Sequence, residues 1–196
     1  MDTLHYAGLF LIKTLFGLYI FIMMMRIILQ WVGANVSNPL VQLVAKLTNP
    51  PLKIFRKIFP VIHGFDIAAF LLLLILEWLK IILLTLITTN GLPIVSGLIV
   101  LAFAEILDLL VNIFLYSILI FVILSWIYPV MNSPVMLLLY QITEPLMRPM
   151  RRILPPISGI DLSPIPVMIL LKLIQIIITQ PLLYIGIGMA MRSVSG

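Results

Sequence analysis

Five charged residues stand inside stretches of the chain that are otherwise almost entirely apolar. They are Lys13, Glu77, Glu105, Asp108 and Lys172. A charge in the hydrocarbon of a membrane is costly, so such residues usually pair with one another or mark a path for ions or protons. We call these five residues the charged seam, and they are the first candidates for chemistry in this protein.

One sequence offset relates four of these residues. Shifting the chain by 95 positions brings Glu77 onto Lys172 and Lys13 onto Asp108. If equivalent helices face each other, each pair predicts a buried ion pair. At about 1.5 Å per residue from Asp66, Glu77 and Lys172 would lie roughly 16 Å deep, near the middle of a membrane. The seam predicts either a structural contact that sets the register of two halves or a functional path for ions or protons.

Other kinds of chemistry find little support in the sequence. The chain has no cysteine, which excludes disulfides, thiolate chemistry and metal or haem held by cysteine. Its two histidines, His5 and His63, lie far apart, and neither has the spacing of a metal ligand. The chain lacks a Ser/His/Asp set, an H-E-x-x-H motif and a glycine-rich phosphate loop. We therefore expect no catalytic residue, no cofactor, no metal site and no enzymatic activity.

The composition indicates a membrane protein. Of the 196 residues, 63% are apolar and 10% are charged, and the mean hydropathy is +1.25. Soluble domains are nearer to half apolar and a quarter charged. A membrane-spanning helix needs about 20 apolar residues, and four stretches meet that length, at residues 6–31, 67–88, 98–128 and 165–191. No basic segment precedes the first apolar run, so a cleaved signal peptide is not expected.

The same offset of 95 positions exposes an internal repeat without any gap. It aligns tryptophans, prolines, arginines, glycines and aspartates, including Trp31 with Trp126 and Arg56 with Arg151. The sequence therefore predicts two units, residues 1–95 and 96–196, each with two spans and a basic connector. An even number of spans per unit sends both units through the membrane in the same direction. The fold class is thus all-α, with four transmembrane helices in two parallel repeats about an axis along the membrane normal.

The two long connectors carry a basic face. Asn38 and Ser133 each precede a proline and predict helix starts, while Pro50 and Pro145 predict that those helices end there. Each connector is accordingly expected to form two short amphipathic helices in the headgroup region, with the basic side towards lipid phosphates. A solvated basic loop is the alternative, and nucleic acid is not expected because no aromatic platform accompanies the charges. The basic face consists of Lys53, Arg56, Lys57, Arg148, Arg151 and Arg152.

Each connector ends in a hinge that leads into the next span. Glycine permits a backbone turn, and an aspartate, or Ser163 followed by Pro164, can cap the helix that follows. Ion or substrate binding by the two aspartates is the alternative reading. The hinge residues are Gly64, Asp66, Gly159, Asp161, Ser163 and Pro164. Since basic loops favour the cytoplasmic side, both long connectors are predicted to be cytoplasmic and both termini outside.

The repeated pattern resembles a known family. Two copies of "W…P…T.P…R+I.P…G.D", the second ending in "SGIDLSP", are similar to the YggT family of integral membrane proteins, also called YlmG-like, from about residue 23 to 189. The first copy departs from it, because Ala68 and Ala69 stand where the second has Ser163 and Pro164. The resemblance implies a bacterial plasma-membrane or plastid-membrane protein without established enzymatic activity. It also implies links to osmotic-stress tolerance, cell division, nucleoid distribution or haem attachment during cytochrome b6 assembly.

Together these features predict a multi-pass, non-enzymatic protein of the bacterial plasma membrane. Its basic connectors would engage anionic lipid headgroups, and a membrane-protein partner or a second copy of the chain is a further candidate partner. The alternative function is a small ion channel or transporter, formed by one chain or by an oligomer, that uses the charged seam.

Overall fold

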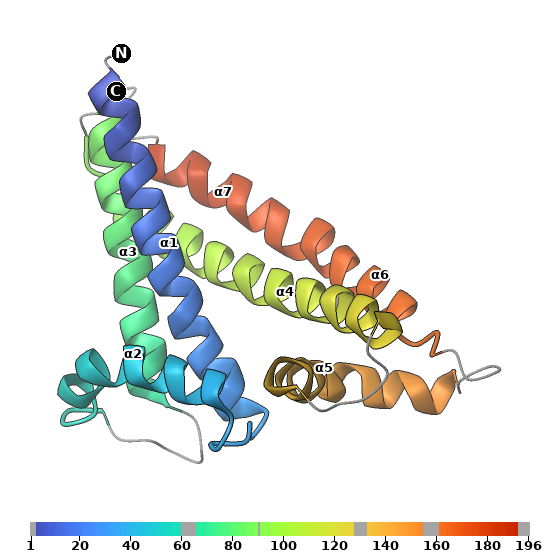
Figure 1. Cartoon of the computed structure of the whole chain (residues 1–196). Helices are drawn as coiled ribbons and strands as arrows, with labels where there is room; N and C mark the ends of the chain where they lie inside the picture. The colour runs from blue at the N-terminus through green and yellow to red at the C-terminus, as the bar shows by residue number, and fades with distance from the viewer. Residues whose placement is uncertain (1–2, 60–65, 90, 128–132, 155–160, 192–196) are drawn as a thin grey trace.

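All regular secondary structure of the described residues is helical (Figure 1). The computed structural model describes residues 3–59, 66–89, 91–127, 133–154 and 161–191, so the predicted hinge residues Gly64 and Gly159 lie outside the described residues. The elements are α1 (Thr3–Trp31), α2 (Pro39–Phe55), α3 (Ile67–Thr89), α4 (Val95–Ile127), α5 (Pro134–Ile153), α6 (Pro164–Ile174), the π-helix η1 (Gln175–Thr179) and α7 (Gln180–Met191).

Four helices are long and apolar enough to cross a membrane, which confirms the expected fold class. They cover His5–Trp31, Ile67–Thr89, Val95–Ile127 and Pro164–Ala190, the last formed by α6, η1 and α7 together. A helix satisfies its backbone hydrogen bonds internally, as lipid requires. Large apolar side chains such as Phe10 and Tyr184 project outward and are 67% and 77% exposed in the isolated chain. Such outward side chains suit a hydrocarbon solvent rather than water.

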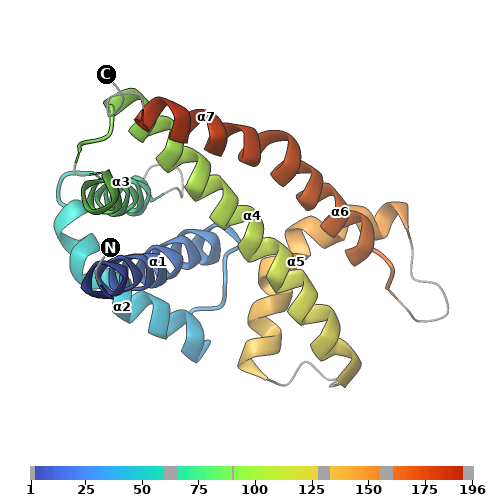
Figure 2. The same cartoon turned by 90° about the horizontal axis from the view of Figure 1, so that it is seen from above.

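The spans are arranged as two pairs of helices. α1 packs along α3, α4 packs along α6, η1 and α7, and the contact of α3 with α4 joins the pairs. In Figure 1, α1 and α3 stand upright while α4 and α7 are inclined. Figure 2 shows the same difference from above, where α3 is seen nearly end-on and α4 and α7 extend sideways. The order of span, amphipathic helix and span occurs twice along the chain; the symmetry axis between the two units stays a prediction.

The amphipathic helices α2 and α5 lie at one end of the molecule, across the ends of the spans (Figure 1). The Asn38 side chain accepts the backbone N–H of Leu40 at 2.9 Å, and the Ser133 hydroxyl accepts that of Met136 at 3.1 Å. Both predicted helix starts are therefore confirmed, each with a proline in the first turn. Asn38 also donates its side-chain amide to the carbonyl of Pro134 at 2.7 Å, which ties the start of α2 to the start of α5.

The prediction that Pro50 and Pro145 end their helices is wrong. α2 continues through Pro50 and Pro51, and α5 continues through Pro145 and Pro149, so each described connector contains one amphipathic helix instead of two. Packing explains the continuity in α2. Thr48 and Leu52, on either side of the prolines, are both completely buried. Pro51 has no N–H and so cannot donate a helix hydrogen bond to the Leu47 carbonyl. That carbonyl accepts a hydrogen bond from the Tyr19 hydroxyl at 3.4 Å instead.

Two glycines allow α4 and α7 to approach closely. A Cβ atom added to Gly97 would lie 2.2 Å from the backbone nitrogen of Ala190, and one added to Gly186 would lie 2.8 Å from Leu101 Cα. Small residues permit this kind of packing between membrane helices, where no hydrophobic effect drives helices together. The contact joins the beginning of α4 to the end of α7.

We expect Gly97→Ala to lower the free energy of unfolding by about 1–3 kcal/mol, because the new methyl group would overlap backbone atoms. Gly188→Ala is the matched control, since a Cβ there meets no atom within 4 Å. Unfolding of the purified variants in detergent micelles measures the difference. Equal stability of the two variants would contradict the close packing of α4 on α7.

Candidate functional site

In the first hinge, an ion pair joins the end of α2 to the beginning of α3. Asp66, which is 4% exposed, accepts the backbone N–H of Ala69 at 3.2 Å and so caps α3 as predicted. Its other carboxylate oxygen accepts a hydrogen bond from the guanidinium of Arg56, which follows α2 directly. The pair therefore fixes where the amphipathic helix ends relative to the first turn of the next span.

The second hinge repeats this ion pair and adds a carboxylate. Arg151 donates from Nε to Asp161 at 2.8 Å and from Nη1 to Glu144 at 2.5 Å. Asp161 accepts the backbone N–H of Ser163 at 2.9 Å, just before α6. The Ser163 hydroxyl makes no cap; it is fully buried and lies 3.9 Å from the sulfur of Met147. Of the two predicted cap residues, Asp161 is the one that binds the backbone, and Pro164 occupies the first turn of α6 as predicted.

The electrostatics of the second hinge favour its charged form. Burial raises the pKa of the Asp161 carboxyl, but hydrogen bonds from Ser163 and Arg151 outweigh burial and hold that pKa below its usual value. Burial lowers the pKa of Arg151, yet its contacts with Asp161 and Glu144 outweigh burial and raise it. The ion pair therefore remains ionised at neutral pH.

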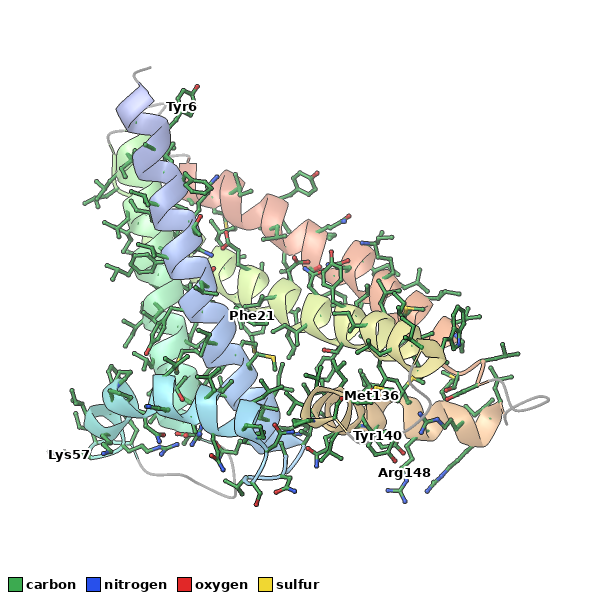
Figure 3. The ribbon with its side chains drawn as sticks, in the orientation of Figure 1. Tyr6, Phe21, Lys57, Met136, Tyr140 and Arg148 are labelled. Carbon is green, nitrogen blue, oxygen red and sulfur yellow. The ribbon has the colours of Figure 1, made fainter. Side chains whose placement is uncertain are left out.

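These hinges divide the predicted basic face into two groups. Arg56 and Arg151 are half-buried and bind carboxylates of their own chain. The other four are exposed, and we call them the outward basic set: Lys53, Lys57, Arg148 and Arg152. Figure 3 shows Lys57 and Arg148, one from each connector, at the same end of the molecule and far from Tyr6. Sequence periodicity identified all six cations but could not separate these groups.

The charged seam forms two clusters, and the first centres on Lys80. Lys80 donates to Glu77, one turn earlier in α3, and to Glu105 of α4 at 2.5 Å. Glu77 is only 1% exposed. Lys13 of α1 is exposed and acts electrostatically on Glu105. Lys80, which was not among the predicted seam residues, thus joins α3 to α4; its position three residues after Glu77 was the available signal.

The second cluster surrounds Asp108 of α4. Asp108 accepts hydrogen bonds from Asn112 at 2.8 Å, Gln175 at 2.9 Å and Thr179 at 3.2 Å. Gln175 and Thr179 are the first and last residues of the π-helix η1. Lys172 donates to Gln175 at 2.7 Å and so reaches Asp108 only through that amide. This cluster joins α4 to η1.

The two ion pairs predicted from the repeat are not formed. Glu77 binds Lys80 instead of Lys172, and Asp108 binds neutral side chains instead of Lys13. The reason is the central place of α4, which packs against both α3 and η1. α3 and the equivalent helices α6 and η1 therefore each contact α4. Lys172 remains exposed on its own helix.

With Lys80 added, the charges of the seam balance in number. Glu77, Glu105 and Asp108 are matched by Lys13, Lys80 and Lys172. Such neutralisation reduces the cost of placing charge among apolar helices and fixes their register. Within the described ranges, no three histidine, aspartate or glutamate side chains are grouped closely enough to hold a metal ion.

The helices and their polar contacts define an integral membrane protein of the multi-span, all-helical class, with two amphipathic helices at one end. The chain belongs to the CCB3/YggT family, whose pattern matches residues 5–87 and again residues 100–182. The two matches begin 95 residues apart, at 5 and 100, which equals the offset of the sequence repeat.

Relatives of similar length support this assignment. The chain is 34% identical over 183 residues to an uncharacterised protein of Pseudomonas aeruginosa, PA0392, covering 93% of each chain. It is 34% identical over 175 residues to the uncharacterised protein YggT of Escherichia coli K12, covering 88% of this chain and 89% of that protein. A Vibrio alginolyticus protein encoded in the proC 3' region is 37% identical over 155 residues, covering 79% and 83%. No solved structure matches the chain.

Neutralising Lys80 should destabilise the protein far more than neutralising Lys172. Lys80→Gln leaves Glu77 and Glu105 without their cation, and breaking a buried ion pair costs about 3–5 kcal/mol. Lys172→Gln, the matched control, removes one hydrogen bond to an amide and should cost less than about 1.5 kcal/mol. The two variants are compared by unfolding in detergent and by accumulation in the membrane.

Exchange of the charges at positions 77 and 172 provides the complementary test. The double variant Glu77→Lys/Lys172→Glu is not expected to regain stability, because these residues do not touch. If each single variant loses stability and the double variant regains it, the ion pair expected from the repeat does form.

The hinge at Asp161 should add a pH dependence at the acid end. Because the folded-state pKa of Asp161 is below its usual value of 3.8, its contribution is fully present above about pH 4. The contribution is lost as pH falls through the lower folded-state pKa. Unfolding measured between about pH 2 and 7 should therefore show a smaller pH dependence for Asp161→Asn than for the parent protein. Identical pH profiles would show that the carboxylate is not held by Arg151.

Proposed function

We propose that this protein is a non-enzymatic membrane protein whose helices α2 and α5 engage anionic lipid headgroups. The supporting observation is the outward basic set, four exposed cations on two amphipathic helices or directly after them, at one end of the molecule. Two neighbouring arginines bind carboxylates of the chain, whereas these four face away from the helical core. They are therefore available to a ligand outside the chain.

Elementary energetics support a lipid surface as that ligand. Each basic residue near an anionic membrane contributes about 1 kcal/mol of attraction, so four of them supply about 4 kcal/mol. Apolar side chains on the same helices add to this attraction, since Ile54 and Ile153 are 66% and 72% exposed. A helix with exposed cations and exposed isoleucines fits the boundary between headgroups and hydrocarbon.

The proposal includes an orientation and a location. Both basic helices lie at one end, and the first turn of α1 and the last turn of α7 lie at the other (Figure 1). By the positive-inside rule, α2 and α5 belong on the cytoplasmic face of a bacterial plasma membrane and both termini belong outside. The resemblance to YggT-type proteins links such a molecule to osmotic-stress tolerance, assembly of membrane complexes or organisation of division and nucleoids. A membrane-protein partner or second copy would then meet the same cytoplasmic end.

The proposed lipid contact can be tested on the whole protein in mixed micelles of phosphatidylglycerol and phosphatidylcholine. The parent protein should retain phosphatidylglycerol in excess. Lys57→Gln/Arg148→Gln, which removes one exposed cation from each connector, should reduce the excess about ten-fold or more, since two charges correspond to about 2 kcal/mol. The retained lipids are counted by phosphorus analysis and mass spectrometry.

A control variant removes the same number of charges elsewhere. Lys13→Gln/Lys172→Gln loses two cations that do not lie on α2 or α5 and should retain the excess. Equal retention by both double variants would refute the proposal. The alternative function, ion conduction along the charged seam, would instead appear as flux in proteoliposomes that Asp108→Asn abolishes.

A further inference from the structure

A pocket of about 370 Å³ lies beside the first hinge, between the last turns of α1 and the helix α2. Arg26 and Gln30 of α1 and Arg56 after α2 line it. Gly33, whose φ of +63° is accessible to glycine without strain, turns the chain at the end of α1 and forms another part of the wall. The pocket therefore combines two guanidinium groups with a backbone turn at the end of the molecule where α2 and α5 lie.

Arg26 is a cation with no ion-pair partner of its own in the described structure. It makes no ion pair, and its Nε atom is buried without a hydrogen-bond partner among the described residues. Arg56 binds Asp66 through one terminal nitrogen, but its Nε is likewise buried and unpartnered there. Arg56 repels Arg26, and Asp66 attracts it. Two arginines and one aspartate leave this hinge with a net charge of +1.

The second hinge has the opposite balance. The position equivalent to Arg26 is Phe121, which packs its ring against Tyr140 with ring centroids 6.1 Å apart. The position equivalent to Glu144 in the first unit is Asn49. Arg151 faces both Asp161 and Glu144, so one arginine and two carboxylates give the second hinge a net charge of −1. Only the first hinge therefore has an uncompensated positive charge beside a pocket.

We propose that the pocket lined by Arg26, Gln30 and Arg56 binds a single phosphate-class anion, the phosphodiester of an anionic lipid or a free phosphate. An oxyanion would supply the negative charge that the hinge lacks and accept hydrogen bonds from planar guanidinium groups, which suit phosphate geometry. Leu29 and Val41 add apolar walls to the pocket. This binding site adds a specific pocket to the proposed lipid contact and rests on that proposed function. Its side chains are different from those of the outward basic set.

The test titrates the delipidated, detergent-solubilised full chain by calorimetry, once with short-chain phosphatidylglycerol and once with inorganic phosphate at constant ionic strength. We expect one saturable site per chain. Saturation by phosphatidylglycerol alone identifies the lipid as the source, and comparable saturation by inorganic phosphate identifies free phosphate. A chain that saturates with neither ligand overturns the proposal, whatever the variants do.

Variants then locate the site. Arg26→Gln should weaken the saturable binding about ten-fold or more. It should fold at least as well as the parent protein without ligand, because it removes a cation that Arg56 repels. Lys53→Gln, an exposed cation of α2 outside the pocket, should change the affinity less than about three-fold. Arg26→Lys keeps the charge but lacks the planar donor group, and an intermediate loss is expected.

The proposed function and the pocket fail in different ways. Loss of saturable binding in Lys57→Gln/Arg148→Gln together with unchanged binding in Arg26→Gln overturns the pocket and leaves the lipid contact of α2 and α5 intact. Saturable binding that Arg26→Gln removes and Lys57→Gln/Arg148→Gln retains supports the pocket, even if the excess of retained anionic lipid proves independent of the outward basic set.

Discussion

The ion pair between an arginine at the end of an amphipathic helix and an aspartate at the start of the next span organises the point where each connector leads into that span. The aspartate must be charged to hold the arginine and to cap the span, while the arginine must leave the lipid-facing side to reach it. One contact therefore sets the angle between a surface helix and a crossing helix. It also determines which cations stay outside, so lipid attraction and folding use separate side chains from the same basic segment.

The elements were predictable because membrane helices carry their signal locally. Twenty or more apolar residues identify a span without knowledge of its neighbours, and Asn38-Pro39 and Ser133-Pro134 contain both the cap and the first helical residue. The family pattern likewise follows the punctuating prolines, arginines, glycines and aspartates. For the hinges, charge and a spacing of ten residues, at 56 and 66 and again at 151 and 161, were present in the sequence. They could have indicated the ion pairs, although the sequence reading assigned the arginines to the lipid face.

The partners inside the membrane were not predictable in the same way. A repeat shows which positions are equivalent but not whether equivalent helices touch, and here α4 lies between α3 and η1. Glu77 therefore binds Lys80, which also binds Glu105, in place of Lys172. The persistence of α2 through Pro50 and Pro51 also depends on a distant residue, Tyr19, and on burial of Thr48 and Leu52. Such outcomes require knowledge of tertiary packing that propensity alone does not contain.

The π-helix η1 has a consequence for the correspondence of the two units. A π-turn closes over one more residue than an α-turn, so every residue after Thr179 is advanced by one position relative to an uninterrupted helix. If the two units are related in space as the sequence offset predicts, the offset from α3 is 95 before η1 and one greater beyond it. Gly186, whose added Cβ would lie 2.8 Å from Leu101 Cα, comes after this shift. A sequence alignment of the units remains ungapped there, whereas a superposition of their backbones is expected to need a one-residue insertion at η1.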